Sequence, residues 1–184
     1  MKKIMVAAAA IAMAVVANAS YVNWTCSNVF LGNDTDKCSG IAYFVNADTI
    51  SSTALKALGD DGAAAITAAL GSSYSFTPAS AGSYVKTAAN AVPVAGLGLA
   101  DTTAYTGYLV IFDGATIADS TKFYTTQEMD FTTLAGDNAV QVKFGSQKVD
   151  STVAGNWTEV APEPTSGLLL LLGVAGLALR RRRA

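Results

Sequence analysis

Histidine is missing from this sequence, and arginine occurs only near its end, in the run Arg180, Arg181, Arg182 and Arg183. Without histidine the chain cannot form the Ser–His or Cys–His pairs that activate many catalytic nucleophiles. The segment before the arginines also lacks the bidentate cation that most often holds phosphate or carboxylate substrates. These absences leave paired carboxylates as the remaining acid–base chemistry.

Negative charge dominates the segment 20–161. It holds 13 of the 14 carboxylates and six of the 12 basic residues, so its net charge is 6 − 13 = −7, against −2 for the whole chain. Nucleic acid and anionic lipid both attract basic surfaces, and we therefore expect no nucleic-acid partner. The spacing of the carboxylates singles out no catalytic pair. We predict a non-catalytic structural or binding domain, with a secreted carboxylate-based hydrolase acting on polysaccharide as the alternative.

Metal sites have little support in the sequence. Two cysteines without a histidine cannot complete a tetrahedral shell unless carboxylates join them. The run Asp34-Thr35-Asp36 lacks the other ligands of a calcium loop, including its distal glutamate, and is typical of a solvated turn. We expect no metal and no cofactor.

The N-terminus has the three parts of a secretory signal. Lys2 and Lys3 precede an apolar run over residues 4–17, and Ala17-Asn18-Ala19 supplies the small-x-small cleavage site. We predict that signal peptidase cuts after Ala19 and that residues 1–19 are removed. The alternative, an uncleaved anchor, is disfavoured because the run is short for a membrane span.

Cys26 and Cys38 are the only cysteines. An even number of cysteines behind a signal peptide predicts a disulfide, and two allow one pairing. Two buried thiols are the alternative. The strands expected over residues 21–26 and 41–45 flank the pair, so the bond would hold the first hairpin at its base.

The segment 20–161 has the length of one domain. Its pattern predicts a mainly β fold: an antiparallel β-sandwich or sheet with a small two-helix insertion. Further strands are expected at residues 105–112, 122–126, 140–144 and 156–160, and the apolar run within residues 105–112 predicts a central strand buried on both faces. Ser51 and Ser52 are expected to cap a helix over 54–58, and Asp60 and Asp61 a second helix over 63–70. Gly59 and Gly71 are expected to end these helices.

The C-terminal tail has three features in order. Pro162-Glu163-Pro164 is followed by an apolar run over residues 167–179, and then by the four arginines. The run of 13 residues spans about 20 Å as a helix, against about 30 Å for a hydrocarbon core. Its seven leucines favour insertion by about 2–4 kcal/mol. A single transmembrane helix of this kind is a marginal anchor, and the arginines should remain cytoplasmic. A terminal core helix with a basic end is the alternative.

These three features resemble the PEP-CTERM sorting domain over residues 162–184. The resemblance implies that an exosortase, a membrane transpeptidase or protease, recognises Pro162, Glu163 and Pro164 and cuts the tail. It also implies a Gram-negative-type bacterium, often one that makes extracellular polysaccharide. The expected course is export, transient anchoring in the inner membrane, and release to the cell surface or extracellular matrix. Polysaccharide is one candidate partner there, and the sequence matches no characterised family between residues 20 and 161.

Overall fold

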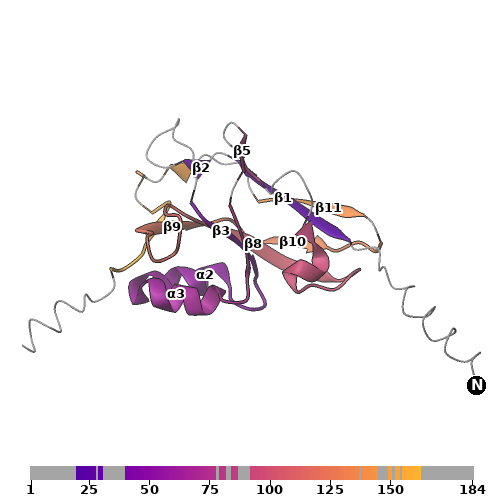
Figure 1. Cartoon of the computed structure of the whole chain (residues 1–184), viewed down its shortest axis with the longest axis horizontal. Helices are drawn as coiled ribbons and strands as arrows, with labels where there is room; N and C mark the ends of the chain where they lie inside the picture. Colours follow the sequence, from indigo (N-terminus) through magenta and orange to yellow (C-terminus); the bar gives the residue numbers. More distant parts are fainter. Residues whose placement is uncertain are drawn as a thin grey trace, which may run out of the picture.

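Two β-sheets stacked face to face, with helices against the outer face of one of them, make up this protein (Figure 1). The mainly β fold with a two-helix insertion is confirmed, and the two sheets make it a sandwich. The structure, a computed structural model, describes residues 20–27, 29–30, 40–77, 79–81, 84–86, 92–136, 138–144, 149–150, 152–153 and 155–162. The expected signal helix and transmembrane helix lie outside these residues.

The sheet next to the helices, here called the central sheet, runs in the order β13-β9-β8-β3-β4, with β10 also paired to β8. All its pairings are antiparallel. Its strands are β3 (Ala42–Asn46), β4 (Tyr74–Phe76), β8 (Ala104–Phe112), β9 (Lys122–Thr125), β10 (Met129–Thr132) and β13 (Thr158–Glu159).

The second sheet runs in the order β11-β1-β6-β5, and β7 also pairs with β1. The expectation of antiparallel pairing fails at one place here, because β1 and β11 run parallel, with Tyr21 beside Ala139. A short parallel pair, β2 with β12, is separate. The bounds are β1 (Tyr21–Ser27), β2 (Val29–Phe30), β5 (Ala79–Ala81), β6 (Tyr84–Lys86), β7 (Val92–Pro93), β11 (Ala139–Lys143) and β12 (Val149–Asp150).

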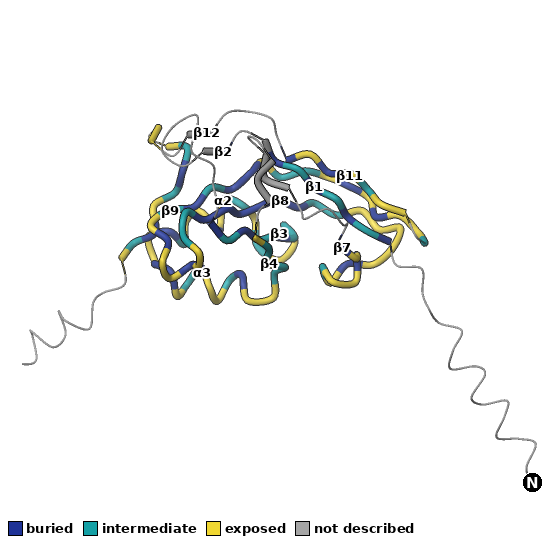
Figure 2. The backbone as a smooth tube through the Cα atoms, turned by 45° about the horizontal axis from the view of Figure 1, so that its top comes forward, coloured by how far each residue is buried: buried dark blue, intermediate teal, exposed yellow. Residues whose placement is uncertain are grey.

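Strand β8 is buried on both faces from Gly107 to Phe112, as its apolar run predicts. Leu109 and Ile111 enter the core between the sheets, while Tyr108, Val110 and Phe112 enter the core under the helices. All five are fully buried. Side chains alternate across a strand, so this strand contributes to two cores at once. Figure 2 shows the buried course of β8 between exposed outer segments.

The helices are α2 (Ser52–Ala57) and α3 (Ala63–Leu70), joined by the 3-10 turn η1 (Leu58–Asp61); a second 3-10 turn, η2 (Val94–Leu97), follows β7. Ser51 caps α2 as expected, since its side chain accepts a hydrogen bond of 3.2 Å from the Ala54 amide. The cap of α3 was wrongly assigned to Asp60 and Asp61. Both lie in η1, and Gly62 holds the cap position with a φ of 85°. A left-handed backbone favours glycine, which explains why no side chain caps this helix.

Gly71 follows α3 with a φ of −55°, a conformation that every residue adopts. A Cβ there would lie 3.6 Å from its nearest neighbours. Gly71→Ala is therefore expected to stabilise the fold by about 0.4–1 kcal/mol, because it restricts only the unfolded chain. Urea denaturation measures this, with Gly62→Ala as the matched control. At the left-handed Gly62, alanine should destabilise, and equal effects at the two sites would contradict the assignment.

The predicted first hairpin is wrong, whereas the predicted bond between Cys26 and Cys38 stays a prediction. Strands β1 and β3 lie in different sheets, where Trp24 and Phe44 meet across the core as stacked rings 4.9 Å apart. No disulfide is seen in the part of the chain that the structure describes. Cys26 is buried in the core, and Cys38 lies outside the described residues. The hairpin prediction failed because both strands show the same inward alternation, which two facing sheets produce as readily as one hairpin.

Tyr124 should make the fold sensitive to alkali. Burial, with a smaller contribution from Cys26, raises its pKa from 10.0 to about 12. Between pH 10 and pH 12 the folded state therefore keeps the Tyr124 proton while the unfolded state loses it. The contribution of Tyr124 to the free energy of unfolding is therefore full below pH 10 and falls as the pH rises towards 12. The difference in free energy of unfolding between the wild type and Tyr124→Phe is expected to change only within this pH range, where the wild type loses stability relative to the variant. Chemical denaturation at several pH values measures this, and parallel stability curves for the two proteins would contradict it.

Candidate functional site

The last described strand, β13, ends at Glu159, and two residues separate it from the Pro-Glu-Pro motif. In β13, Thr158 pairs with Phe123 of β9. The Val160 amide then donates to the Thr121 carbonyl at 2.8 Å, and the Ala161 amide donates to the Gly59 carbonyl at 2.8 Å. Val160 is buried, and its side chain packs in the core under the helices. The chain is therefore part of the fold up to Ala161.

Gly59 allows this close junction because it has no side chain. A Cβ at Gly59 would lie 2.5 Å from the Glu159 carbonyl oxygen, which is backbone and cannot yield cheaply. Its φ is not positive, so the expected left-handed helix end is wrong. The glycine is required because the turn between α2 and α3 and the strand β13 approach each other closely. This contact ties the end of the domain to its helical layer.

Pro162 is the first exposed residue after the junction, since Val160 is buried and Ala161 half-buried. Proline has no amide hydrogen, so the backbone hydrogen bonds that end with Ala161 cannot extend through it. Glu163, Pro164, the apolar run and the arginines lie outside the described residues. The first residue of the motif is thus placed at the surface, beside the end of the fold.

Ser20, the predicted mature N-terminus, is likewise integrated into the domain. It is 1% exposed, and its hydroxyl donates to the Asp101 carboxylate. Its carbonyl accepts from the Val94 amide at 2.8 Å, and the Tyr21 amide donates to Asn138. Ala17 and Ala19, which form the predicted cleavage site, lie outside the described residues.

The two junctions lie at opposite ends of the domain. In Figure 1 the chain enters beside β1 and β11, and it leaves beside β9 and the helices. A membrane-bound tail would therefore hold the domain by its helical end. The end of the sandwich near Ser20 would point away from the attachment.

The acidic side chains near the strand ends bind the chain's own backbone and hydroxyls. Asp113 accepts from both the amide and the hydroxyl of Thr121, which holds the turn between β8 and β9. Glu128 accepts from the Ser52 amide at 2.7 Å, where α2 begins. Within the described residues no group of three or more acidic, cysteine or histidine side chains is placed to hold a metal ion.

Burial also raises the pKa of Tyr108, and the nearby Glu128 adds to this effect. Its hydroxyl donates to the Ile50 carbonyl at 2.8 Å, so it fastens β8 to the segment before α2. This is a structural contact that positions the helical layer and, through it, the C-terminal junction.

No described helix is long and apolar enough to cross a membrane, and the predicted span at 167–179 lies outside the residues in question. At the end of the chain, residues 160–183 match the family described as the PEP-CTERM protein-sorting motif. Neither a curated protein nor a solved structure matches the chain.

The chain therefore carries a PEP-CTERM protein-sorting motif, as its sequence predicted, and this motif supports sorting by an exosortase. The match begins at Val160, two residues before the first proline. Val160 and Ala161 thus belong both to the matched motif and to the fold. Sequence reasoning could not find this overlap, because it depends on the pairing of β13 with β9.

Proposed function

We propose that this protein is a surface or matrix component delivered in three steps. Signal peptidase exposes Ser20 during export. The apolar run at 167–179 then holds the chain briefly in the inner membrane. An exosortase finally cuts beyond Ala161, near Pro162–Pro164, and releases the acidic domain to the cell surface or the extracellular matrix.

One observation carries this proposal: the last hydrogen bond of the described fold is made by Ala161, immediately before Pro162-Glu163-Pro164. A cut on the C-terminal side of Ala161 would leave every described contact of the domain in place. A cut before Val160 would instead remove a buried side chain and two backbone hydrogen bonds. The geometry thus supports processing at the motif without loss of the folded product.

The short apolar run supports a temporary anchor. At about 20 Å it covers only part of a hydrocarbon core of about 30 Å, so the bilayer must thin or the arginines must extend to the headgroups. Such a span suits an intermediate that is soon cut. The arginines would fix its orientation and prevent the tail from passing through the membrane.

For the released domain we propose a non-catalytic structural or binding role, with extracellular polysaccharide as the candidate partner. The described carboxylates that form hydrogen bonds do so mainly within turns and between neighbouring strands. This use of acidic side chains supports a scaffold more than a carboxylate-based hydrolase.

The test is to fractionate cells of two otherwise identical hosts, one with an exosortase and one without. In the first, the domain should leave the membrane, and in the second it should remain membrane-bound with its arginines. A variant whose apolar run is lengthened to about 20 leucine and alanine residues serves as an anchored control. Equal release of the native chain from both hosts would contradict the proposal.

A further inference from the structure

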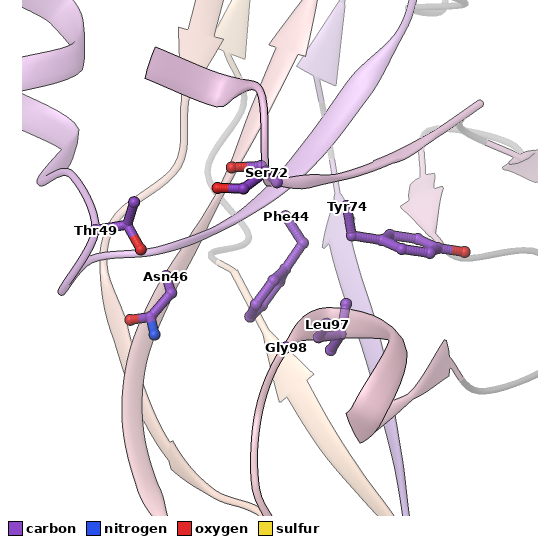
Figure 3. A pocket seen from close by; sticks show the side chains of 8 residues that line it. Phe44, Asn46, Thr49, Ser72, Tyr74, Leu97 and Gly98 are labelled. Atoms are coloured by element: carbon purple, nitrogen blue, oxygen red, sulfur yellow. The ribbon is translucent and has the colours of Figure 1, made fainter. Parts of the chain in front are cut away.

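A pocket of about 190 Å³ opens where the central sheet meets η2. Phe44 and Asn46 come from β3 and its end, Ser72 and Ser73 from the turn after α3, and Leu97 from η2. Thr49, Tyr74 and Gly98 complete the lining. Figure 3 shows Asn46 and Thr49 on one side of the pocket and Leu97 on the other, with Phe44 between them.

The polar groups of this lining have spare hydrogen-bonding capacity. The Asn46 amide oxygen accepts from the Asp48 amide at 3.0 Å, which fixes the side chain and leaves its NH2 group to donate. Among the described residues, the hydroxyls of Thr49, Ser72 and Ser73 have no hydrogen-bond partner. A hydroxyl can both donate and accept, so the pocket offers three adaptable groups and one fixed donor.

The apolar part of the lining is rigid. Phe44 is 3% exposed and stacks on Trp24 at 4.9 Å, and Tyr74 lies 6.0 Å from the same tryptophan in an edge-on arrangement. The backbone of Phe44 pairs with that of Tyr74 in the sheet. Few rotamers remain to be ordered when a ligand binds, which favours even a small one.

Among the described residues that line the pocket, none has an acidic or basic side chain. This lining offers an ionic ligand no counter-charge to offset the hydration that it gives up on binding, so it favours a neutral ligand. Its volume is below the roughly 300–1,000 Å³ of pockets that take drug-sized molecules. Hydroxyl-rich surroundings and limited space together fit one hydroxylated ring.

We propose that this pocket binds a single neutral sugar ring, such as the end of a polysaccharide chain. The hydroxyls of Thr49, Ser72 and Ser73 and the Asn46 NH2 bond the ring hydroxyls, while Leu97 contacts its less polar face. This inference deepens the proposed binding role of the released domain and is independent of how the tail is processed.

Amide chemical shifts of the exported protein, titrated with methyl glucoside and methyl galactoside, test this directly. At least one of them should shift the amides of Ser72, Ser73 and Gly98 saturably, with a Kd of about 1 mM for so small a ligand. Gly155, outside the pocket, should not move. Glucuronate and glucosamine, which are charged, should bind at least tenfold more weakly.

Thr49→Val removes one hydroxyl at nearly constant volume and should weaken binding by about two- to tenfold. Ser72→Ala should do the same. Thr67→Val, on the exposed surface of α3, is the matched control and should leave the Kd unchanged. The melting temperature of each variant separates lost binding from lost folding.

Saturable shifts confined to the pocket, weakened by Thr49→Val but not by Thr67→Val, would support the proposal. Absence of binding by both methyl hexosides at about 100 mM would overturn it. Binding of the charged sugars as tight as that of the neutral ones, or shifts elsewhere only, would overturn it as well. Neither outcome would bear on release of the domain, which the two-host fractionation measures separately.

Discussion

A chain that ends at Ala161 is expected to be as stable as one that ends at Ser166, whereas a chain that ends at Trp157 should lose about 3–5 kcal/mol. The first truncation removes residues that follow Ala161, which makes the last hydrogen bond among the described residues. The second removes the buried Val160 side chain, worth about 1.5–2 kcal/mol, and the backbone bonds of residues 158–161, worth about 1 kcal/mol each. Such a loss is a large share of the 5–15 kcal/mol of an ordinary domain.

Urea denaturation of three chains that all begin at Ser20 measures these differences. Val160→Ala in the chain ending at Ala161 serves as an internal control and should cost about 1–3 kcal/mol. If removing residues 162–166 destabilised the domain as much as removing residues 158–166, the fold would extend into the sorting motif. The domain could not then be released intact by a cut near Pro162.

Replacing Pro162-Glu163-Pro164 with three alanines is expected to change the protein from mainly released to mainly membrane-bound in an exosortase-bearing host. The prolines hold the segment extended and remove backbone donors, which keeps it out of local secondary structure and open to an enzyme. Alanine favours helix and removes the recognised side chains. The domain itself should unfold at the same temperature as the native one, because in the described part of the chain the backbone hydrogen bonds end with Ala161.

Alanine at Thr165 and Ser166 is the matched control, since it changes neighbouring polar residues and leaves the motif intact. This variant should be released as efficiently as the native chain. Equal release of the native and triple-alanine chains would show that the motif does not direct processing. The tail would then be a plain anchor or be removed by an unrelated protease.

Local features of this fold were predictable where a residue type has one dominant use. The apolar run of β8 predicted a central strand, and it is fully buried from Tyr108 to Phe112. Ser51 predicted the start of α2, and the range of α3 was predicted to the residue. These predictions succeeded because burial and capping depend mainly on neighbours in sequence.

Long-range pairing was not predictable in the same way. The alternation in β1 is compatible with any partner, so the parallel neighbour β11 and the assignment of β1 and β3 to different sheets could not be read from it. Strand β6 lies between β1 and β5, in a segment of mostly small residues. Small residues carry too weak a hydrophobic pattern to reveal such a strand.

The functional features also differ in whether they depend on residues that are neighbours in sequence. The sorting tail was recognisable because its residues are contiguous and ordered, and the family match confirms it. No sequence pattern predicts the pocket, because Asn46, Ser72 and Leu97 come from three separate segments. The role of Gly59 depends on its contact with Glu159, 100 residues later, and the sequence around Gly59 does not predict this contact.

The intact mass of the protein released by its own host tests the central claim most directly. The proposal predicts one chain that begins at Ser20, retains Ala161, and ends before the apolar run that starts at Gly167. Its mass would then exclude Arg180 to Arg183. A released or surface-bound protein whose mass at steady state includes the four arginines would contradict sorting by cleavage at this motif.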